Sequence, residues 1–89
     1  MAQSKTVILE REGIAEQIRA AIAESEIPEG ERVLLCSMRL FQWIINRVGI
    51  LPPEEMRRQL GADMIGLGYL EDRKILVTSR ETARRITGK

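Results

Sequence analysis

Basic side chains are concentrated in the second part of the chain, where they are numerous enough to contact a phosphate backbone. Residues 32–89 hold eleven Lys and Arg against six Asp and Glu, whereas residues 1–31 hold three against seven. Arginine suits phosphate because its guanidinium group donates forked hydrogen bonds. The sequence predicts a surface for double-stranded DNA formed by Arg57, Arg58, Arg73, Lys74, Arg80, Arg84 and Arg85. The alternative is a solvated face whose charges form local ion pairs with Glu54, Glu55, Glu71 and Asp72.

Residue types that perform catalysis are scarce. The chain has no His, so the commonest general base and metal ligand is missing. Cys36 is the single Cys, and no His can activate it as a nucleophile. Neighbouring acidic residues such as Glu54 and Glu55 do not converge when they lie side by side on a helix. We therefore expect a protein that is not an enzyme, with no catalytic residues, no metal or other cofactor and no small-molecule substrate.

The run RVLLCSMRLFQWIINRVGIL, Arg32–Leu51, is expected to form one long helix over residues 31–48. Its apolar residues would cover far more than one face, and such a helix needs cover on several sides. A chain of 89 residues is a single small domain, 1–89, with a modest core, so a second subunit could supply that cover. We expect a homodimer or a protein partner to contact Leu35, Cys36, Phe41, Trp43 and Ile44. The alternative for Trp43 is a place in the core of one chain.

The expected surroundings of the chain follow from the same residues. Arg32, Arg39 and Arg47 oppose insertion of the apolar run into a membrane, so no membrane partner is expected. A single Cys excludes an intramolecular disulfide, and no secretory signal is visible. The expected localisation is therefore the reducing cytoplasm.

Hydrophobic periodicity and turn residues predict the remaining elements. Strands are expected over 6–9 and 74–78, paired with each other, and helices over 12–25 and 53–60. Thr78 and Glu81 have the spacing of a capping box for a last helix that ends near residue 87. One or two further helical turns are expected within residues 63–70. The predicted fold class is α+β and mostly α, with four or five helices and a small sheet of two or three strands.

Three segments resemble GntR-type winged-helix DNA-binding domains. Ile14–Val33, IAEQIRAAIAESEIPEGERV, resembles their first helix and the turn after it, and Leu51–Asp63, LPPEEMRRQLGAD, is similar to the next helix. Gly68–Thr78, GYLEDRKILVT, resembles the end of a recognition helix that leads into the wing. The apolar stretch Arg32–Val48 has no counterpart in that family. The resemblance implies a winged-helix-like fold with DNA contacts from Arg57, Arg58, Arg73 and Lys74.

Two functions from different classes agree with these features. The first is a small DNA-binding regulatory protein, winged-helix-like, that acts as a homodimer. The second is a non-enzymatic protein-interaction module, such as an inhibitor or adaptor from a phage or another mobile element, that binds a host protein. The basic residues favour the first function, and the apolar run with its aromatic residues favours the second.

Overall fold

The computed structural model describes residues 4–71 and 73–88, and in that part of the chain four strands alternate irregularly with four helices. The bounds of these elements, in chain order, are β1 (Lys5–Ile8), α1 (Ile14–Ser25), β2 (Arg32–Cys36), α2 (Met38–Val48), α3 (Pro53–Leu60), β3 (Asp63–Leu67), β4 (Lys74–Ser79) and α4 (Arg80–Thr87).

The strands form a mixed sheet in the order β1-β4-β2-β3. β4 is antiparallel to both neighbours, with Ile75 opposite Val7 of β1 and Val77 opposite Leu34 of β2. β2 and β3 are parallel, so the chain must cross over between them, and it does so through α2 and α3. The expected pairing of the first strand with residues 74–78 is confirmed.

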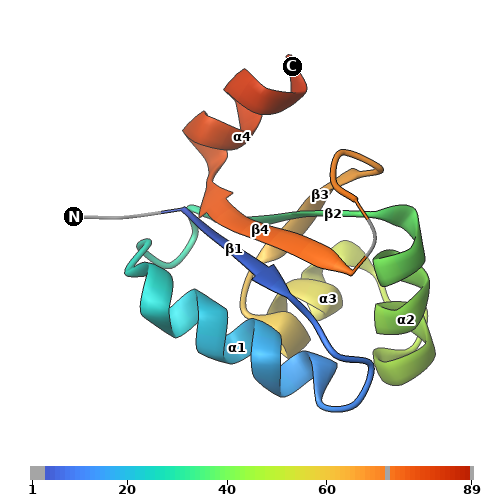
Figure 1. Ribbon diagram of the computed structural model, residues 1–89. Coiled ribbons are helices and arrows are strands. Elements are labelled where there is room, and N and C mark those ends of the chain that lie inside the picture. The colour runs from blue at the N-terminus through green and yellow to red at the C-terminus, as the bar shows by residue number, and fades with distance from the viewer. Residues whose placement is uncertain (1–3, 72, 89) are drawn as a thin grey trace.

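Helices cover the two faces of the sheet unequally (Figure 1). α1, α2 and α3 lie against one face, where their apolar side chains pack with Leu34, Cys36, Ile75 and Val77 in the main core. α4 stands on the other face, which we call the outer face, and its Ala83 packs with Val33 and Leu35 of β2. The periodic Ile residues of α1 point into the main core, as the spacing of four residues predicts.

The prediction of one helix over residues 31–48 is wrong. Residues 32–36 form β2, and Ser37 then starts α2 by accepting a hydrogen bond from the backbone N–H of Leu40 at 3.0 Å. β2 lies between β4 and β3 and is covered on both faces, and such strands carry continuous rather than alternating apolar residues. The many apolar faces that we assigned to one helix therefore belong to a central strand followed by an amphipathic helix.

The helical turns predicted within residues 63–70 are also wrong, because Asp63–Leu67 is β3. Gly66 has a steric role in this strand: a Cβ atom there would lie 2.3 Å from Cδ2 of Leu35 on the neighbouring strand. The expected cap of the last helix is displaced by one residue. Thr78 is buried in β4, and Ser79 caps α4 by accepting from the N–H of Thr82 at 3.2 Å.

The α+β class is confirmed, whereas the sheet is larger than expected. It holds four strands in the described residues, and both β2 and β3 lie in segments that were expected to be helical. The segment that we compared with the end of a recognition helix begins after β3 and contains the turn into β4. The part of the chain expected to read a DNA groove is therefore a strand and a turn.

Candidate functional site

The seven basic residues predicted to bind DNA lie in three places. One group lines a hollow beside α3, a second lies at the start of β4 at the opposite end of that strand from α4, and a third extends along α4. The three groups are, in that order, Arg57, Arg58 and Arg80; Arg73 and Lys74; and Arg84 and Arg85. The structure therefore brings three of the seven together in one hollow, whereas Arg84 and Arg85 continue along α4 from Arg80, and Arg73 and Lys74 lie at the far end of β4.

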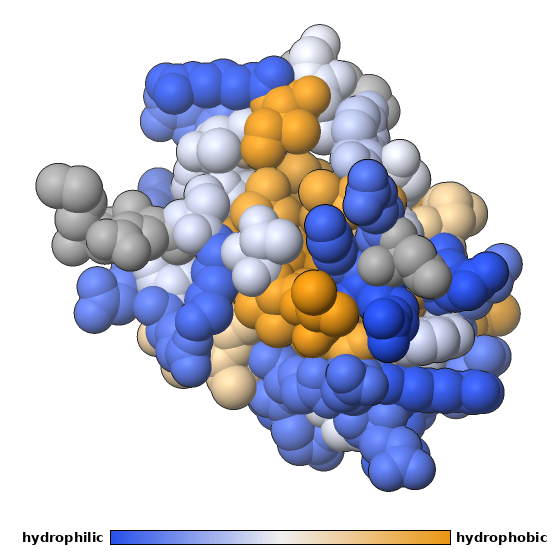
Figure 2. All heavy atoms as spheres, in the orientation of Figure 1, coloured by the Kyte–Doolittle hydropathy of each residue, from blue (hydrophilic) through white to orange (hydrophobic). Residues whose placement is uncertain are grey.

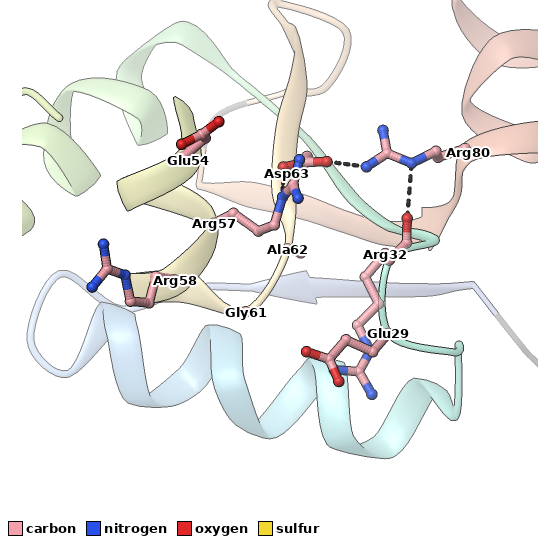
Figure 3. A pocket seen from close by; sticks show the side chains of 10 residues that line it. Glu29, Arg32, Glu54, Arg57, Arg58, Gly61, Ala62, Asp63 and Arg80 are labelled. Atoms are coloured by element: carbon pink, nitrogen blue, oxygen red, sulfur yellow. Dashed lines mark hydrogen bonds and ion pairs between the residues drawn. The ribbon is translucent and has the colours of Figure 1, made fainter. Parts of the chain in front are cut away.

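We call the hollow that the first group lines the arginine hollow (Figure 3). It has a volume of about 350 Å³ and lies where α3 meets the starts of β2, β3 and α4. Asp63 joins two of its arginines: Arg57 Nε donates to Oδ1 at 2.5 Å, and Arg80 forms an ion pair with Oδ2. Arg80 Nε also donates to the carbonyl oxygen of Gly30 at 2.9 Å. This network ties α3, β3, α4 and the turn before β2 to one another.

Asp63 is ionised because of these partners. Burial of its carboxyl group opposes ionisation, but the hydrogen bonds and positive charges of Arg57 and Arg80 outweigh it and lower the pKa. The same hydrogen bond and charge raise the pKa of Arg57, which stays protonated. The side chain of Asp63 is only 13% exposed, so the carboxylate is a structural partner for the two guanidinium groups.

The remaining residues of the arginine hollow reduce its positive charge. Glu29, Glu54 and Asp63 lie in the lining with four Arg, so the excess is one positive charge. Arg58 points away from the centre in Figure 3 and pairs with Glu55. Arg32, which the sequence did not single out for this site, donates from Nε to the carbonyl oxygen of Ile27 at 2.7 Å. The hollow can contact an anion at its rim, but its central arginines are already occupied.

A second concave surface lies beside β3, and we call it the apolar groove. It has a volume of about 430 Å³, and its walls come from α2, the linker after α2, α3 and β3. The residues that line it are Phe41, Leu51, Pro53, Met56, Arg57, Asp63, Met64, Ile65 and Leu67. Its two charged members, Arg57 and Asp63, neutralise each other. The groove is thus an uncharged, apolar depression along an edge strand of the sheet.

Exposed apolar side chains gather around this groove. Ile65 is 44% exposed and Leu67 is 39% exposed, both on β3. Met38, which is exposed, lies near the end of β3, because a Cβ atom on Gly68 would be 3.8 Å from its Cγ. Ile50, at 87% exposed, directly precedes a residue of the lining. Solvation of so much apolar surface is unfavourable, so this region is a candidate interface.

Another apolar area lies on the outer face. Figure 2 shows a stripe of apolar atoms that runs from α4 across the sheet and is bordered by hydrophilic atoms. The strand register places Leu76 and Leu35 opposite each other there, and Ile8 of β1 and Ile86 of α4 are exposed. Leu70 and Leu76 pack on the buried Val33, Leu35 and Ala83, so α4 and the turn before β4 already cover part of this face.

The structure separates the residues predicted to form an interface. Leu35, Cys36 and Ile44 are fully buried inside one chain, so the prediction that they face a partner is wrong. They are buried by other residues of the same chain, because β2 is a central strand and Ile44 lies on the inner face of α2. Phe41 and Trp43 are partly buried against the main core and keep some exposed surface. Phe41 lines the apolar groove, and Trp43 lies in another hollow with Arg11.

Cys36 and the acidic residues offer no catalytic arrangement. Burial raises the pKa of the Cys36 thiol to about 12, which makes the thiolate very rare near neutral pH. In residues 4–71 and 73–88, no cluster of three or more His, Cys, Asp or Glu side chains could hold a metal ion. Within the same residues, no helix has both the length and the apolar character needed to cross a membrane.

Comparison with known proteins gives no indication of function, which must be inferred from the geometry of the chain. The chain matches no family model, no curated protein and no solved structure. Sequence reasoning missed the apolar groove because it interpreted Asp63–Leu67 as helical. The signal that could have found it is the pair Gly66 and Gly68 within the predicted turns, since each Gly disfavours a helix by about 1 kcal/mol relative to Ala.

Proposed function

We propose that the protein is a non-enzymatic interaction module that forms a homodimer by pairing the β3 strands of two copies. The observation that carries this proposal is the open edge of β3, where exposed Ile65 and Leu67 lie along the apolar groove. An open strand edge presents unpaired N–H and C=O groups, and an added strand satisfies them while its side chains fill neighbouring depressions.

The two edges of the sheet differ in how they are protected. β1, at the far edge, alternates between partly buried and exposed residues, and its Lys5 forms an ion pair with Glu24. Charged residues of this kind hinder pairing with another strand. β3 has the sequence DMIGL, and its one charged residue, Asp63, is held by Arg57 and Arg80 within the chain. The side chain of Asp63 is 13% exposed and that of Lys5 is 40% exposed, so β3 is the edge with less exposed charge. The register shift against β2 leaves Ile65 without an aligned residue on that strand.

A second copy of the chain suits this edge by symmetry and by charge. Antiparallel pairing about a two-fold axis at Ile65 would place Ile65 beside its own copy in the second chain. The register against β2 aligns Leu67 with Cys36 of the main core, so Leu67 and Ile65 of each copy would lie beside the apolar grooves. The neutral Arg57–Asp63 pair adds no repulsion between like copies. The two sheets would become one continuous sheet.

Light scattering after gel filtration tests the proposal. The expected molar mass is twice that of the 10.1 kDa chain, and Ile65→Lys is expected to give the mass of one chain. The matched control is Ile86→Lys, because Ile86 on α4 is 46% exposed and Ile65 is 44% exposed. Circular dichroism checks that both variants keep their secondary structure. A wild-type protein with the mass of one chain at high concentration, or a dimer that Ile65→Lys does not dissociate, would contradict the proposal.

A DNA-binding regulator is the second candidate, and the arginine hollow is the observation that favours it. Arg57, Arg58 and Arg80 come together there from three of the predicted positions, with Arg32 added. Binding to a DNA duplex should weaken steeply with added salt, because each phosphate contact releases counterions. The test is a mobility-shift titration at low salt with wild-type protein and with Arg58→Gln, which leaves the Asp63 network intact. Absence of a shift at micromolar protein would remove this candidate.

A further inference from the structure

A third hollow lies between the start of α1 and the end of α2, apart from the arginine hollow and from the apolar groove. It has a volume of about 650 Å³ and is lined by Arg11, Glu12, Gly13, Trp43, Asn46 and Arg47. None of these residues lines the other two surfaces. We propose that this hollow binds an adenine nucleotide, with the base between the Trp43 indole and the Arg11 guanidinium group and the phosphate on Arg47.

The position of Arg11 over Trp43 fits a flat ring. The Arg11 Cζ atom lies 6.0 Å from the centroid of the indole. Stacked bases are about 3.4 Å apart, so a base between the guanidinium group and the indole needs about 6.8 Å. Arg11 is exposed, so it can move outward by the missing fraction of an ångström. Aromatic rings and guanidinium groups both stack on nucleobases, so the base would have the Trp43 indole on one face and the Arg11 guanidinium group on the other.

The backbone that carries Arg11 is held in place. Gly13, at φ 72°, closes the turn before α1, and Gln17 on the first turns of α1 fixes that turn through its side chain. Gln17 Oε1 accepts from the N–H of Glu10 at 2.9 Å, and its Nε2 donates to the carbonyl oxygen of Glu12 at 2.7 Å. Because the backbone on each side of Arg11, at Glu10 and at Glu12, is hydrogen-bonded to Gln17 of α1, the backbone position of Arg11 is fixed relative to that helix.

The polar residues of this hollow match the rest of a nucleotide. Among the residues that the structure describes, neither Arg11 nor Arg47 takes part in an ion pair, so Arg11 can stack on the base and Arg47 can pair with a phosphate group. Asn46 is exposed on the same stretch of α2, and a side-chain amide matches the adjacent acceptor and amino group of adenine. Glu12 adds an acceptor for that amino group.

Intrinsic fluorescence gives a direct measurement, because Trp43 is the one tryptophan of the chain. Adenosine monophosphate is titrated into wild-type protein, with excitation at wavelengths where adenine does not absorb. We expect saturable quenching of Trp43 emission. Arg47→Gln should weaken binding about tenfold through the loss of one charge-assisted hydrogen bond, and Arg11→Gln should weaken it by a similar factor through the loss of stacking on the base. The matched control is Arg73→Gln, an exposed arginine at the start of β4, which should bind like wild type. Circular dichroism confirms the fold of each variant.

Further titrations separate the sources of the ligand. Uridine monophosphate should bind more weakly than the adenine nucleotide, and inorganic phosphate should not quench. Tighter binding of a single-stranded oligo(dA) than of the mononucleotide identifies a nucleic acid strand as the source, and equal binding identifies the free nucleotide. The proposal is overturned by an unquenched Trp43 at millimolar nucleotide, by equal affinities in wild type and Arg47→Gln, or by quenching with inorganic phosphate alone. None of these outcomes depends on whether the β3 strands pair.

Discussion

Replacing Asp63 by Asn tests the network that joins α3, β3 and α4. In the Asp63→Asn variant the amide oxygen can still accept from one arginine, but the NH₂ group faces the other guanidinium group as a second donor. One charge-assisted hydrogen bond is lost and the other is weakened, and each contributes about 1.5–3 kcal/mol when intact. Because the side chains of Arg57 and Arg80 are 55% and 37% exposed, solvent screens part of this effect. We expect a loss of about 2 kcal/mol, or about 8–16 °C in Tm.

The pH dependence of this loss has a definite sign. The folded-state pKa of Asp63 lies below its ordinary value of about 3.9, so the ionised carboxylate stabilises the folded chain above that value. The contribution disappears as the pH falls through the lowered pKa, because the carboxyl group then carries its proton in both states. The difference in free energy of unfolding between wild type and Asp63→Asn should therefore be full at neutral pH and shrink below about pH 4.

Urea denaturation followed by Trp43 fluorescence measures both effects. The matched control is Glu71→Gln, whose side chain is 88% exposed and pairs with Lys74 at 3.5 Å, and it should change the free energy of unfolding by less than about 0.5 kcal/mol. The reasoning fails if Asp63→Asn is no more destabilising than this control. It also fails if the difference between wild type and Asp63→Asn is the same at neutral pH and at about pH 3.

Two further predictions follow from the sheet. Gly66→Ala should destabilise the protein by about 1–3 kcal/mol in the same urea assay, because the new Cβ would lie 2.3 Å from Cδ2 of the fully buried Leu35, and that side chain must then shift within its packed cluster. Unchanged stability would show that the strand or the Leu35 side chain accommodates the methyl group. Cys36, with its pKa raised to about 12, should be about one part in 10⁴ thiolate at pH 8 and should react with a thiol reagent only on unfolding, so rapid reaction of the native protein would contradict its burial.

The elements found from sequence were those with one dominant local signal. α1 has Ile residues at intervals of four. α3 begins at Pro53 and is capped by Gly61, so the residue types at its two ends mark where it starts and stops. β1 and β4 are short runs rich in β-branched residues, and their pairing was predicted correctly. In each case the local preference and the tertiary environment agree, which is the condition under which sequence patterns are informative.

The rest of the fold depended on contacts between distant residues. β2 and α2 are separated by Ser37 alone, and a strand covered on both faces has the same composition as a buried helix. β3 carries two unusual features for a strand, Gly66 and a register shift against β2 between Leu34 and Leu35, and neither can be recognised before the neighbouring strand is known. The candidate surfaces share this dependence, since Asp63 meets Arg80 only because β3 and α4 begin at the same end of the sheet.

The position of β4 has a consequence for the order in which the molecule assembles. β4 is the last strand in the chain, yet it lies between β1 and β2, so these two earlier strands have no sheet neighbour in common until residues 74–79 arrive. During synthesis, a chain that lacks this segment leaves Val7 and Val33 on strands that cannot join. Such distant pairing slows folding, because the loop must close before the contacts form. The final sixteen residues therefore supply the strand that joins β1 to the rest of the sheet. A protein shortened before Lys74 should not form a sheet that keeps the other three strands together.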